Sequence, residues 1–264
     1  AAADTRHTLT QQEVEWCVEL KQALTAEGIP IPQPDFLLAQ FALVGKGQVT
    51  KAVNRVKKYQ KLIQGEYGYQ NCEASIGSLG FMNRKWPTML AAGQNDAKGR
   101  PVLALDVAPY LPKQLAGEEE WHHLVHEFLI VFDAVNADLD EVRKGCVMIS
   151  ECRMMGWQNF SLELEKRAAP LYQDGYPGKF SQFPLVGAGK ILSAILKMFR
   201  LFLSKKMASR MVICSEDELF SEQYGYRRDQ LPSFLGGTYN INFEDYMRER
   251  LARRAESVER VRIP

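Results

Sequence analysis

Short apolar runs that alternate with helical segments constrain the fold of this chain more than any other feature. Four runs rich in apolar and β-branched residues are expected as strands, and segments of helical period stand between them. The expected strands cover residues 102–107, 146–150, 180–186 and 211–214, and the expected helices cover 118–133, 160–169 and 189–203. Strand, helix and strand at this spacing indicate βαβ crossovers, because the helices are long enough to join parallel strands. The sequence therefore predicts an α/β fold with a mainly parallel β-sheet.

The residues before this alternation predict a separate helical unit. Thr10 can cap a first helix, because Glu13 stands at the capping-box position. A second helix is expected after Asp35, and a third over residues 49–63 has apolar residues on one side and lysines on the other. Residues 243–262 form a last amphipathic segment. We expect three parts: a helical module (1–75), an α/β domain (76–240) and a C-terminal amphipathic helix (241–264).

The composition excludes several classes of protein. The 264 residues are 46% hydrophobic and 25% charged, as in ordinary globular proteins, which excludes disorder and collagen-like repeats. Lys and Arg total 33 against 32 for Asp and Glu, so the net charge of +1 gives no reason to expect a nucleic-acid partner. No stretch has the roughly 18 uncharged apolar residues that span a bilayer. Five cysteines without a CxxC pair, and an N-terminal segment without an apolar core, favour a reducing, cytoplasmic location.

Motifs for enzymatic chemistry are weak in this sequence. The segment GAGK at residues 187–190 lacks residues that a phosphate loop and a dinucleotide fingerprint require. His122 and His126 stand four residues apart on one helix face, a spacing that can hold zinc, but Glu127 lies outside the pair. No G-x-S-x-G motif is present. We therefore expect no enzyme activity, no metal and no cofactor; a metal-dependent hydrolase at His122 and His126 is the remote alternative.

Residues 189–210, GKILSAILKMFRLFLSKKMASR, combine a broad apolar face with clustered cations. Seven large apolar residues lie at helical spacing, and six lysines and arginines accompany them without an acid. Such a segment suits the interface of an anionic membrane, where each nearby cation adds about 1 kcal/mol. The same pattern fits a core helix of an α/β protein whose lysines are solvated. Composition alone leaves both interpretations open.

Four stretches of the sequence carry a resemblance to one known family. Residues 36–62, FLLAQFALVGKGQVTKAVNRVKKYQKL, are similar to its N-terminal helical module. DAKGRPV at 96–102 is similar to its DKDGRPV turn before the first strand, and residues 176–210 follow its strand and gate-helix segment without a gap. LPSFLGGT at 231–238 resembles its closing LPxEYGGT motif. In this order, the four stretches resemble the CRAL-TRIO family of lipid-binding and lipid-transfer proteins.

The resemblance implies a helical N-terminal module, followed by a sheet floor with helices that enclose one apolar lipid pocket. It also implies that residues 189–203 form a gate helix, which swings aside at the membrane while the lipid exchanges. A lipid needs a dry pocket, because each CH₂ exposed to water costs about 0.8 kcal/mol. Side chains alternate along a strand, so about half of each strand faces the pocket. The candidate lining residues are Met148, Ile149, Phe180, Phe183, Leu185, Ile191, Ile195, Phe199, Phe202 and Ile213.

The residues expected near a polar headgroup depart from the family pattern. Members that hold phosphatidylinositol have a glutamate and a basic residue after a Tyr-Pro step, and a threonine and a lysine after the gate. The corresponding residues here are Gly178, Lys179, Met207 and Arg210. Two polar groups are absent, which would leave inositol hydroxyls unpaired, and the closing motif has Phe234 and Leu235 in place of Glu and Tyr. The sequence disfavours phosphatidylinositol as cargo and favours an isoprenoid, a sterol-like or tocopherol-like molecule, or a diacyl lipid held through its tails.

The expected function is binding of a hydrophobic small molecule or lipid and its exchange at membranes. We expect a cytoplasmic monomer that associates peripherally with anionic membranes, including phosphoinositide headgroups. The cations expected at the headgroup or the membrane are Lys179, Lys197, Arg200, Lys205, Lys206 and Arg210. The alternative is a lipid-sensing regulatory or scaffold module that recruits a partner through the helix at residues 243–262.

Overall fold

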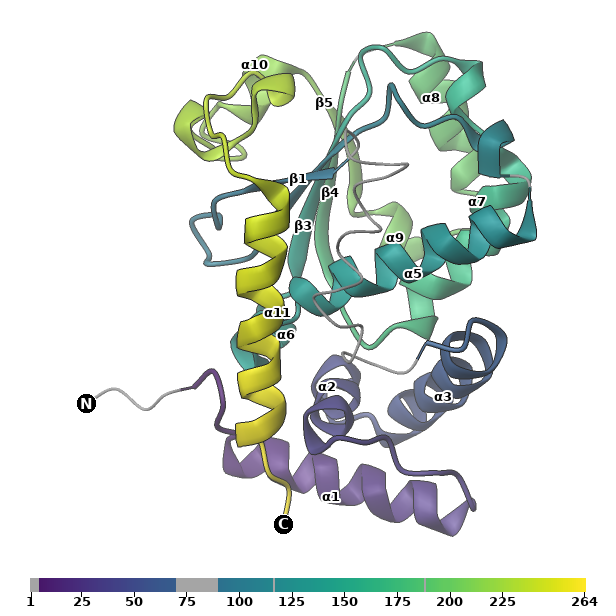
Figure 1. Cartoon of the computed structure of the whole chain (residues 1–264), viewed down its shortest axis with the longest axis vertical. Helices are drawn as coiled ribbons and strands as arrows, with labels where there is room; N and C mark the ends of the chain where they lie inside the picture. Colours follow the sequence, from purple (N-terminus) through teal and green to yellow (C-terminus); the bar gives the residue numbers. More distant parts are fainter. Residues whose placement is uncertain (1–4, 70–89, 116, 188) are drawn as a thin grey trace.

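The computed structural model describes residues 5–69, 90–115, 117–187 and 189–264. Figure 1 shows helices of the N-terminal region at the foot of the molecule, a twisted sheet above them, and one long C-terminal helix that runs along both. Within the described ranges, no helix combines the length and the apolar character needed to cross a bilayer.

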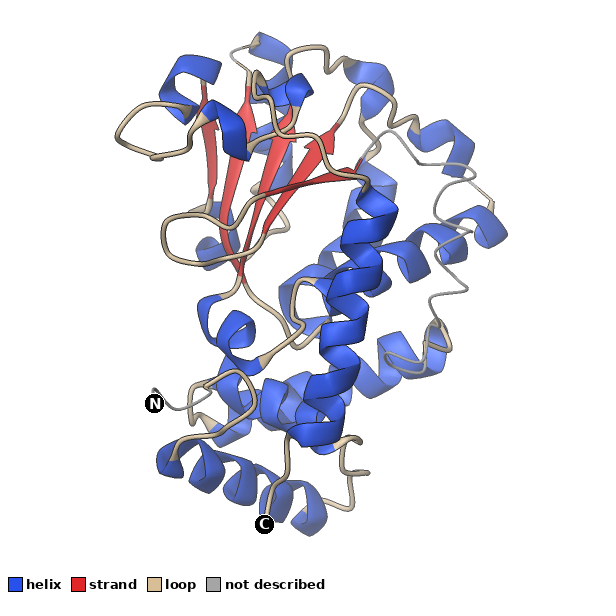
Figure 2. Cartoon of the chain, turned by 60° about the vertical axis from the view of Figure 1, so that its left-hand side comes forward, coloured by secondary structure: helices blue, strands red, loops and turns tan. Residues whose placement is uncertain are grey.

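Within the described residues, five strands form one sheet in the order β1-β2-β3-β4-β5 (Figure 2). The strands are β1 (Leu90–Gly93), β2 (Val102–Asp106), β3 (Cys146–Glu151), β4 (Phe180–Val186) and β5 (Met211–Cys214). β1 pairs antiparallel with β2, and the other neighbours pair in parallel. The predicted α/β fold with a mainly parallel sheet is confirmed. All four expected strands are present to within one residue, and β1 was not expected.

Helices stand between the parallel strands along the chain. They are α5 (Glu118–Ala134), α6 (Leu139–Lys144), α7 (Leu162–Pro170), α8 (Lys190–Phe199) and α9 (Lys205–Ala208), with α10 (Glu216–Leu219) after β5. Short 3₁₀ or π turns are η3 (Pro112–Leu115), η4 (Trp157–Asn159), η5 (Leu171–Gly175), η6 (Arg228–Gln230) and η7 (Ser233–Leu235). Because sequential strands are neighbours, crossovers of the usual hand place their helices on one side. Figure 1 shows α5, α7, α8 and α9 there and α10 on the other side.

The helix expected over residues 189–203 is shorter in the structure. α8 ends at Phe199, and the separate helix α9 begins after Ser204. The Ser204 hydroxyl accepts a hydrogen bond from the backbone N–H of Met207 at 3.2 Å, which is the geometry of an N-cap. The expected helix therefore ends four residues early, and Ser204 caps a second, short helix that was not expected.

Alternating side chains of the strands belong to two separate cores. On β3, Val147 and Ile149 point to a smaller core, which Leu231 and Leu235 cover from the outer side. Met148, between the two, points to the larger core beneath the connecting helices. This alternation is the ordinary period of a strand, and it makes the helical side of the sheet the place where a cavity can form.

The N-terminal layer consists of α1 (Gln11–Ala26), α2 (Asp35–Gly45), α3 (Val49–Tyr59) and the π-helix η1 (Gln60–Glu66). The expected capping box is confirmed: the Thr10 hydroxyl accepts from the N–H of Glu13 at 3.3 Å, and the Glu13 carboxylate accepts from the N–H of Thr10 at 2.9 Å. α2 is buried over residues 36–43, so it needs neighbours on all sides. The larger core continues from this layer to the sheet. The expected boundary at residue 75 lies outside the described residues, and the division into three parts stays a prediction.

The C-terminal helix α11 (Phe243–Arg260) turns an arginine into the core. The Arg254 guanidinium is fully buried and lies 2.8 Å from the Asp133 carboxylate of α5. The hydroxyls of Tyr69 and Tyr176 donate to the same carboxylate at 2.6 and 2.5 Å. A buried carboxylate needs such donors because it has lost its hydration. The network therefore joins the end of the N-terminal layer, α5, the segment before β4 and α11.

Replacing Arg254 with methionine should lower the free energy of unfolding by about 3–5 kcal/mol, because Asp133 would remain as a buried charge without its cation. Arg248→Met removes a surface pair from the same helix and should cost less than about 1 kcal/mol. Equilibrium unfolding in urea measures both. Equal losses in the two variants would show that the buried pair does not hold the elements together.

A second buried acid makes the stability depend on pH. Glu127 of α5 is buried, and its Oε1 atom has no hydrogen-bond partner among the described residues. Burial raises the pKa of this carboxyl from 4.5 to about 8. As the pH rises, the unfolded chain loses this proton before the folded chain does. The free energy of unfolding should therefore fall between about pH 4.5 and pH 8, by at most about 1.4 kcal/mol per pH unit.

Glu127→Gln should make this decline with pH shallower, since the amide carries no proton to lose. Glu119→Gln, on the exposed first turn of the same helix, should keep the slope of the native chain. Urea unfolding at several pH values between 5 and 8 gives the three slopes. An unchanged slope in E127Q would contradict the assignment of the buried proton.

Candidate functional site

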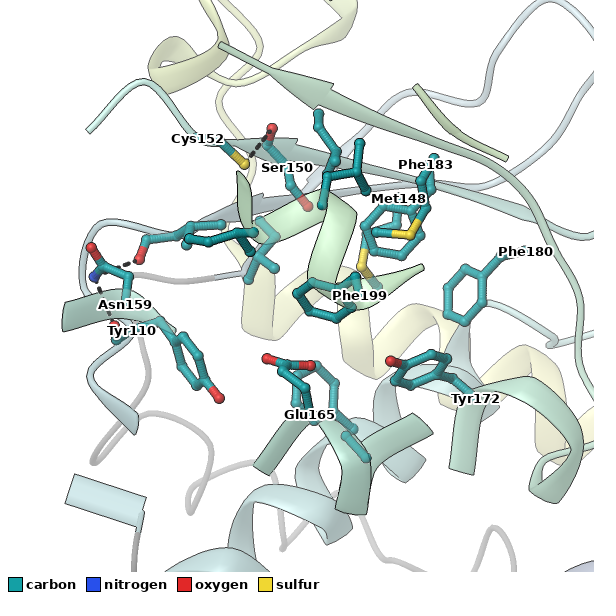
Figure 3. A pocket seen from close by; sticks show the side chains of 18 of the residues that line it. Tyr110, Met148, Ser150, Cys152, Asn159, Glu165, Tyr172, Phe180, Phe183 and Phe199 are labelled. Carbon is teal, nitrogen blue, oxygen red and sulfur yellow. Dashed lines mark hydrogen bonds between the residues drawn. The ribbon is translucent and has the colours of Figure 1, made fainter. Parts of the chain in front are cut away.

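An apolar cavity lies between the sheet and the helices α5, α7 and α8 (Figure 3). Its volume is about 190 Å³, whereas a void that holds one water needs only roughly 10–15 Å³. Strands β2, β3, β4 and β5 all contribute side chains to its lining. A space of this size exceeds a packing defect, so it is a feature of how the helices sit on the sheet.

A bulge in β4 decides which of its side chains face the cavity. Phe180 pairs with Cys146, and the next pair in the ladder skips Ser181. One extra residue in a strand reverses the alternation of side chains that follows it. Phe180, Phe183 and Leu185 therefore all line the cavity, although three positions separate the first two.

One side of α8 closes the cavity. Leu192, Ile195, Leu196 and Phe199 line it, at the i, i+3, i+4 and i+7 spacing of a single helix face. Lys197 lies on the exposed side of the helix. The lining from α5 consists of Trp121, Leu124, Val125, Phe128 and Phe132. Two helices from different crossovers thus present apolar faces to one space.

The structure brings six of the ten expected lining residues to the cavity. They are Met148, Phe180, Phe183, Leu185, Ile195 and Phe199. Ile149 is a wrong prediction, because it points to the smaller core on the other face of the sheet. Phe202 and Ile213 pack against the larger core without lining the cavity. Ile191 is half-buried beside the lining stripe of α8 and is also outside the lining.

The sequence interpretation missed Leu192 and Leu196 of α8. It treated residues 189–203 as one helix, so a stripe that passes through Phe202 was expected. Counting back from Phe199 by three, four and seven residues identifies the observed face. The helix end at Phe199 is the information that was lacking, and Ser204 is the sequence signal that could have supplied it.

Several polar side chains line the cavity, among them Tyr110, Ser150, Asn159, Glu165 and Tyr172. The Asn159 amide donates to three backbone carbonyls, including that of Tyr110 at 2.8 Å, so it is occupied within the protein. Glu165, Tyr110 and Tyr172 direct their oxygen atoms into the cavity (Figure 3), and these oxygens form no hydrogen bond with another described residue. Burial raises the pKa of the Glu165 carboxyl to about 8. Burial, and then the charge of Glu165, raises the pKa of both tyrosines.

Cations from distant parts of the sequence gather beside α9. Burial, followed by the charges of Lys46 and Arg210, lowers the pKa of Lys179. Burial and the same two cations also lower the pKa of Lys206. We call Lys46, Lys179, Lys206 and Arg210 the basic cluster. Lys46 was not expected there, because it lies in the turn between α2 and α3, far away in the sequence.

Lys205 is exposed next to the basic cluster, and Lys197 and Arg200 are exposed on α8 and at its end. Lys179 is tied in place, since its Nζ donates to the carbonyl of Arg143 at 2.7 Å. The expected membrane cations therefore form two groups: those of the cluster with Lys205, and those of α8.

The two positions that lack the family's polar residues offer no polar side chain in this fold. A Cβ atom added at Gly178 would lie 2.9 Å from ring atoms of Tyr176 and 3.1 Å from the amide nitrogen of Asn136. A glutamate therefore does not fit there without movement of its neighbours. Met207 lines the cavity with an apolar side chain where a threonine hydroxyl was possible.

The two histidines of the remote hydrolase alternative are used in packing. The His126 Nε2 atom lies 2.6 Å from the carbonyl oxygen of Tyr67, and the His122 ring meets the ring of Tyr67 edge-on. Across the described parts of the chain, no three His, Cys, Asp or Glu side chains are placed to hold a metal ion. This arrangement gives the hydrolase alternative no support.

The described cysteines are free and buried. They are Cys17, Cys146, Cys152 and Cys214, and Cys72 lies outside the described residues. Burial raises the pKa of the first three thiols to about 12 and that of Cys214 to about 11. A protonated, buried thiol is a poor nucleophile, so these side chains serve as small apolar residues.

Comparisons with known proteins agree with this architecture. Residues 88–237, more than half of the chain, match the CRAL/TRIO domain. The crystal structure of Sfh5 is similar in fold, with a TM-score of 0.52 and 11% sequence identity over 94% of this chain and 99% of that chain. No curated protein matches the chain. The protein belongs to the CRAL-TRIO family, whose members bind or transfer lipids and are generally carriers rather than enzymes.

Proposed function

We propose that this protein carries a hydrophobic small molecule or lipid in the cavity and exchanges it at membranes through movement of α8. The apolar lining of the cavity, in a member of a lipid-binding family, is the observation that carries the proposal. A chain of roughly ten buried carbons gains about 8 kcal/mol from leaving water, before the costs of binding are subtracted. A ligand held mainly through its carbon skeleton therefore suits this site.

The nature of the polar contacts supports a cargo other than phosphatidylinositol. A side chain at Gly178 would collide with Tyr176, and Met207 offers no hydroxyl. An inositol ring that enters this end would keep hydroxyls without partners, each at a cost of roughly 1–3 kcal/mol. An isoprenoid, a sterol-like or tocopherol-like molecule, or a diacyl lipid held through its tails avoids this cost.

Exposed apolar side chains near α8 suit a membrane surface. Leu201 follows α8 and is 85% exposed, Met154 in the loop before η4 is 76% exposed, and Trp157, the first residue of η4, is 53% exposed. Phe160, directly after η4, contacts Phe199 of α8 with ring centroids 5.6 Å apart. Large apolar side chains that remain in water are typical of docking sites, and tryptophan favours the bilayer interface. We assign this edge to contact with the membrane, so that docking and movement of α8 are coupled.

The basic cluster and Lys205 supply the electrostatic part of docking in this proposal. Anionic headgroups, including phosphoinositides, are the matching chemistry. The buried thiols fit a reducing compartment, and we propose a cytoplasmic monomer that associates peripherally with the membrane. We propose further that it acts without catalysis, a cofactor or a resident metal.

The scaffold alternative requires a free apolar face on the C-terminal helix. Met247 and Leu251 of α11 are instead buried, and the helix packs against α5 and α2 of its own chain. The outward side of α11 is charged, which suits solvent. A carrier is therefore favoured over a module that recruits a partner through this helix.

Filling the cavity should block binding. Leu185→Trp places a large ring in the space above β4 and should weaken binding of a pyrene-labelled alkane at least ten-fold, which is about 1.4 kcal/mol. Val212→Trp adds the same ring at an exposed position of β5 and should leave binding unchanged. Fluorescence titration measures the affinity, and vesicle-to-vesicle transfer of a labelled lipid should fall in step. Transfer that persists in L185W would contradict the cavity as the carrier site.

Removing two cations should weaken docking. The double variant Lys205→Ala with Lys206→Ala should lose about 2 kcal/mol of binding to anionic liposomes at low salt, which is roughly 30-fold. The loss should shrink at high salt, because counterions screen exposed charges. Arg248→Ala with Arg260→Ala removes the same charge from α11 and serves as the control in liposome co-sedimentation. An affinity that does not change at low salt would exclude Lys205 and Lys206 as docking cations.

A further inference from the structure

One corner of the apolar cavity is polar, and we call it the polar corner. It consists of the Glu165 carboxyl with the hydroxyls of Tyr110 and Tyr172 (Figure 3). Glu165 comes from α7, Tyr172 from η5 directly after it, and Tyr110 from the segment between β2 and η3. The charge of Glu165 raises the pKa of both tyrosines, so the three groups lie within electrostatic reach of one another.

The polar corner has hydrogen-bonding capacity that the described residues do not use. Buried donors and acceptors are normally paired, and an unpaired one costs roughly 1–3 kcal/mol. Asn159 of the same cavity follows this rule with three backbone partners. The three oxygen groups of the polar corner instead face the open space (Figure 3). These three groups can therefore form hydrogen bonds with a polar group of the molecule that occupies the cavity.

We propose that the polar corner binds an uncharged hydroxyl group, so that the cargo is an apolar alcohol whose carbon skeleton occupies the rest of the cavity. This inference rests on the carrier function proposed above. A hydroxyl is both a donor and an acceptor, and so are a tyrosine hydroxyl and a protonated carboxyl. One ligand hydroxyl can therefore donate to one member of the polar corner and accept from another.

The charges around the cavity favour a neutral ligand group. Burial alone raises the pKa of Glu165 to about 8, and no described cation offsets it. Arg167 of the same helix pairs with Glu118 at 2.9 Å and stacks on the ring of Trp121. Burial raises the pKa of Cys152 to about 12 and raises that of the two tyrosines of the polar corner, so these groups stay protonated. A phosphate or carboxylate would enter this space without a counter-charge.

The test uses the full chain, freed of lipid, with a pyrene-labelled alkane as the fluorescent reporter. Hexadecan-1-ol, hexadecyl methyl ether and hexadecanoate compete for the site, since they share one carbon chain and differ at the polar end. At pH 7 we expect the alcohol to displace the reporter at roughly ten-fold lower concentration than the ether or the carboxylate, the effect of about one buried hydrogen bond.

Variants show whether Glu165 causes the preference. The Glu165→Leu variant should lose the preference for the alcohol but still bind the reporter. The Glu165→Gln variant keeps the size of the side chain and its hydrogen bonding, so it should retain the preference. Tyr110→Phe and Tyr172→Phe should each reduce it. Met148→Leu changes the same cavity without touching a polar group and should keep the native preference.

A pH series provides a readout that a purely structural role would not change. Above about pH 8, Glu165 is ionised and can only accept. The ether, which also only accepts, should then lose affinity relative to the alcohol. The Glu165→Gln variant should show no such change with pH. This comparison does not need the Glu165→Leu variant, so it tests the proposal even if that variant folds poorly.

The outcomes separate the two proposals. A reporter that does not bind would overturn the carrier function together with this inference. A reporter that binds but is displaced equally by alcohol and ether would overturn only the alcohol assignment. Tighter binding of hexadecanoate than of the alcohol would do the same, as would a preference that survives in E165L.

Discussion

Arg254 reaches from α11 to Asp133 of α5, and neither side chain is exposed to solvent. An ion pair without water must be well matched to balance the lost hydration of both groups. Tyr69 and Tyr176 complete the match through their hydroxyls. Because the four residues come from four different parts of the chain, the position of α5 depends on all of them. α5 provides one wall of the cavity, so this buried carboxylate fixes the site as well as the fold.

The opposite wall of the cavity is held by a different kind of contact. Within the described residues, α8 forms no ion pair, and its contacts with the core are apolar. Phe199 meets Phe160 of the loop that also exposes Trp157. Apolar contacts have no fixed direction, so a bilayer can replace them at little cost. The distribution of contacts thus makes α5 the fixed wall and α8 the one suited to move, in agreement with the proposed exchange.

Local patterns in the sequence were enough to predict the four parallel strands, the order of the helices and the family, since these depend on neighbouring residues. Side-chain directions were harder to predict. The bulge at Ser181 shifts the alternation in β4, and it arises from pairing with β3 rather than from β4 itself. Arg254 stands in a charged helix where an arginine normally faces water, and its burial is explained by partners from distant segments, above all Asp133. Side-chain directions that depend on contact between two distant segments were therefore not predicted from the sequence.

Glu165 is the strongest case of this kind. It lies in the helical segment LELEK, whose alternating acids are typical of a solvated face, and Glu163 is indeed exposed. Only closure of α8 and α5 over the sheet makes the space beside Glu165 an apolar interior. Polarity is thus missing at Gly178 and Met207, where the family resemblance led us to look for it, and present on α7. The position of the polar groups in the pocket decides which end of a ligand is recognised. Members of one fold can therefore bind different ligands.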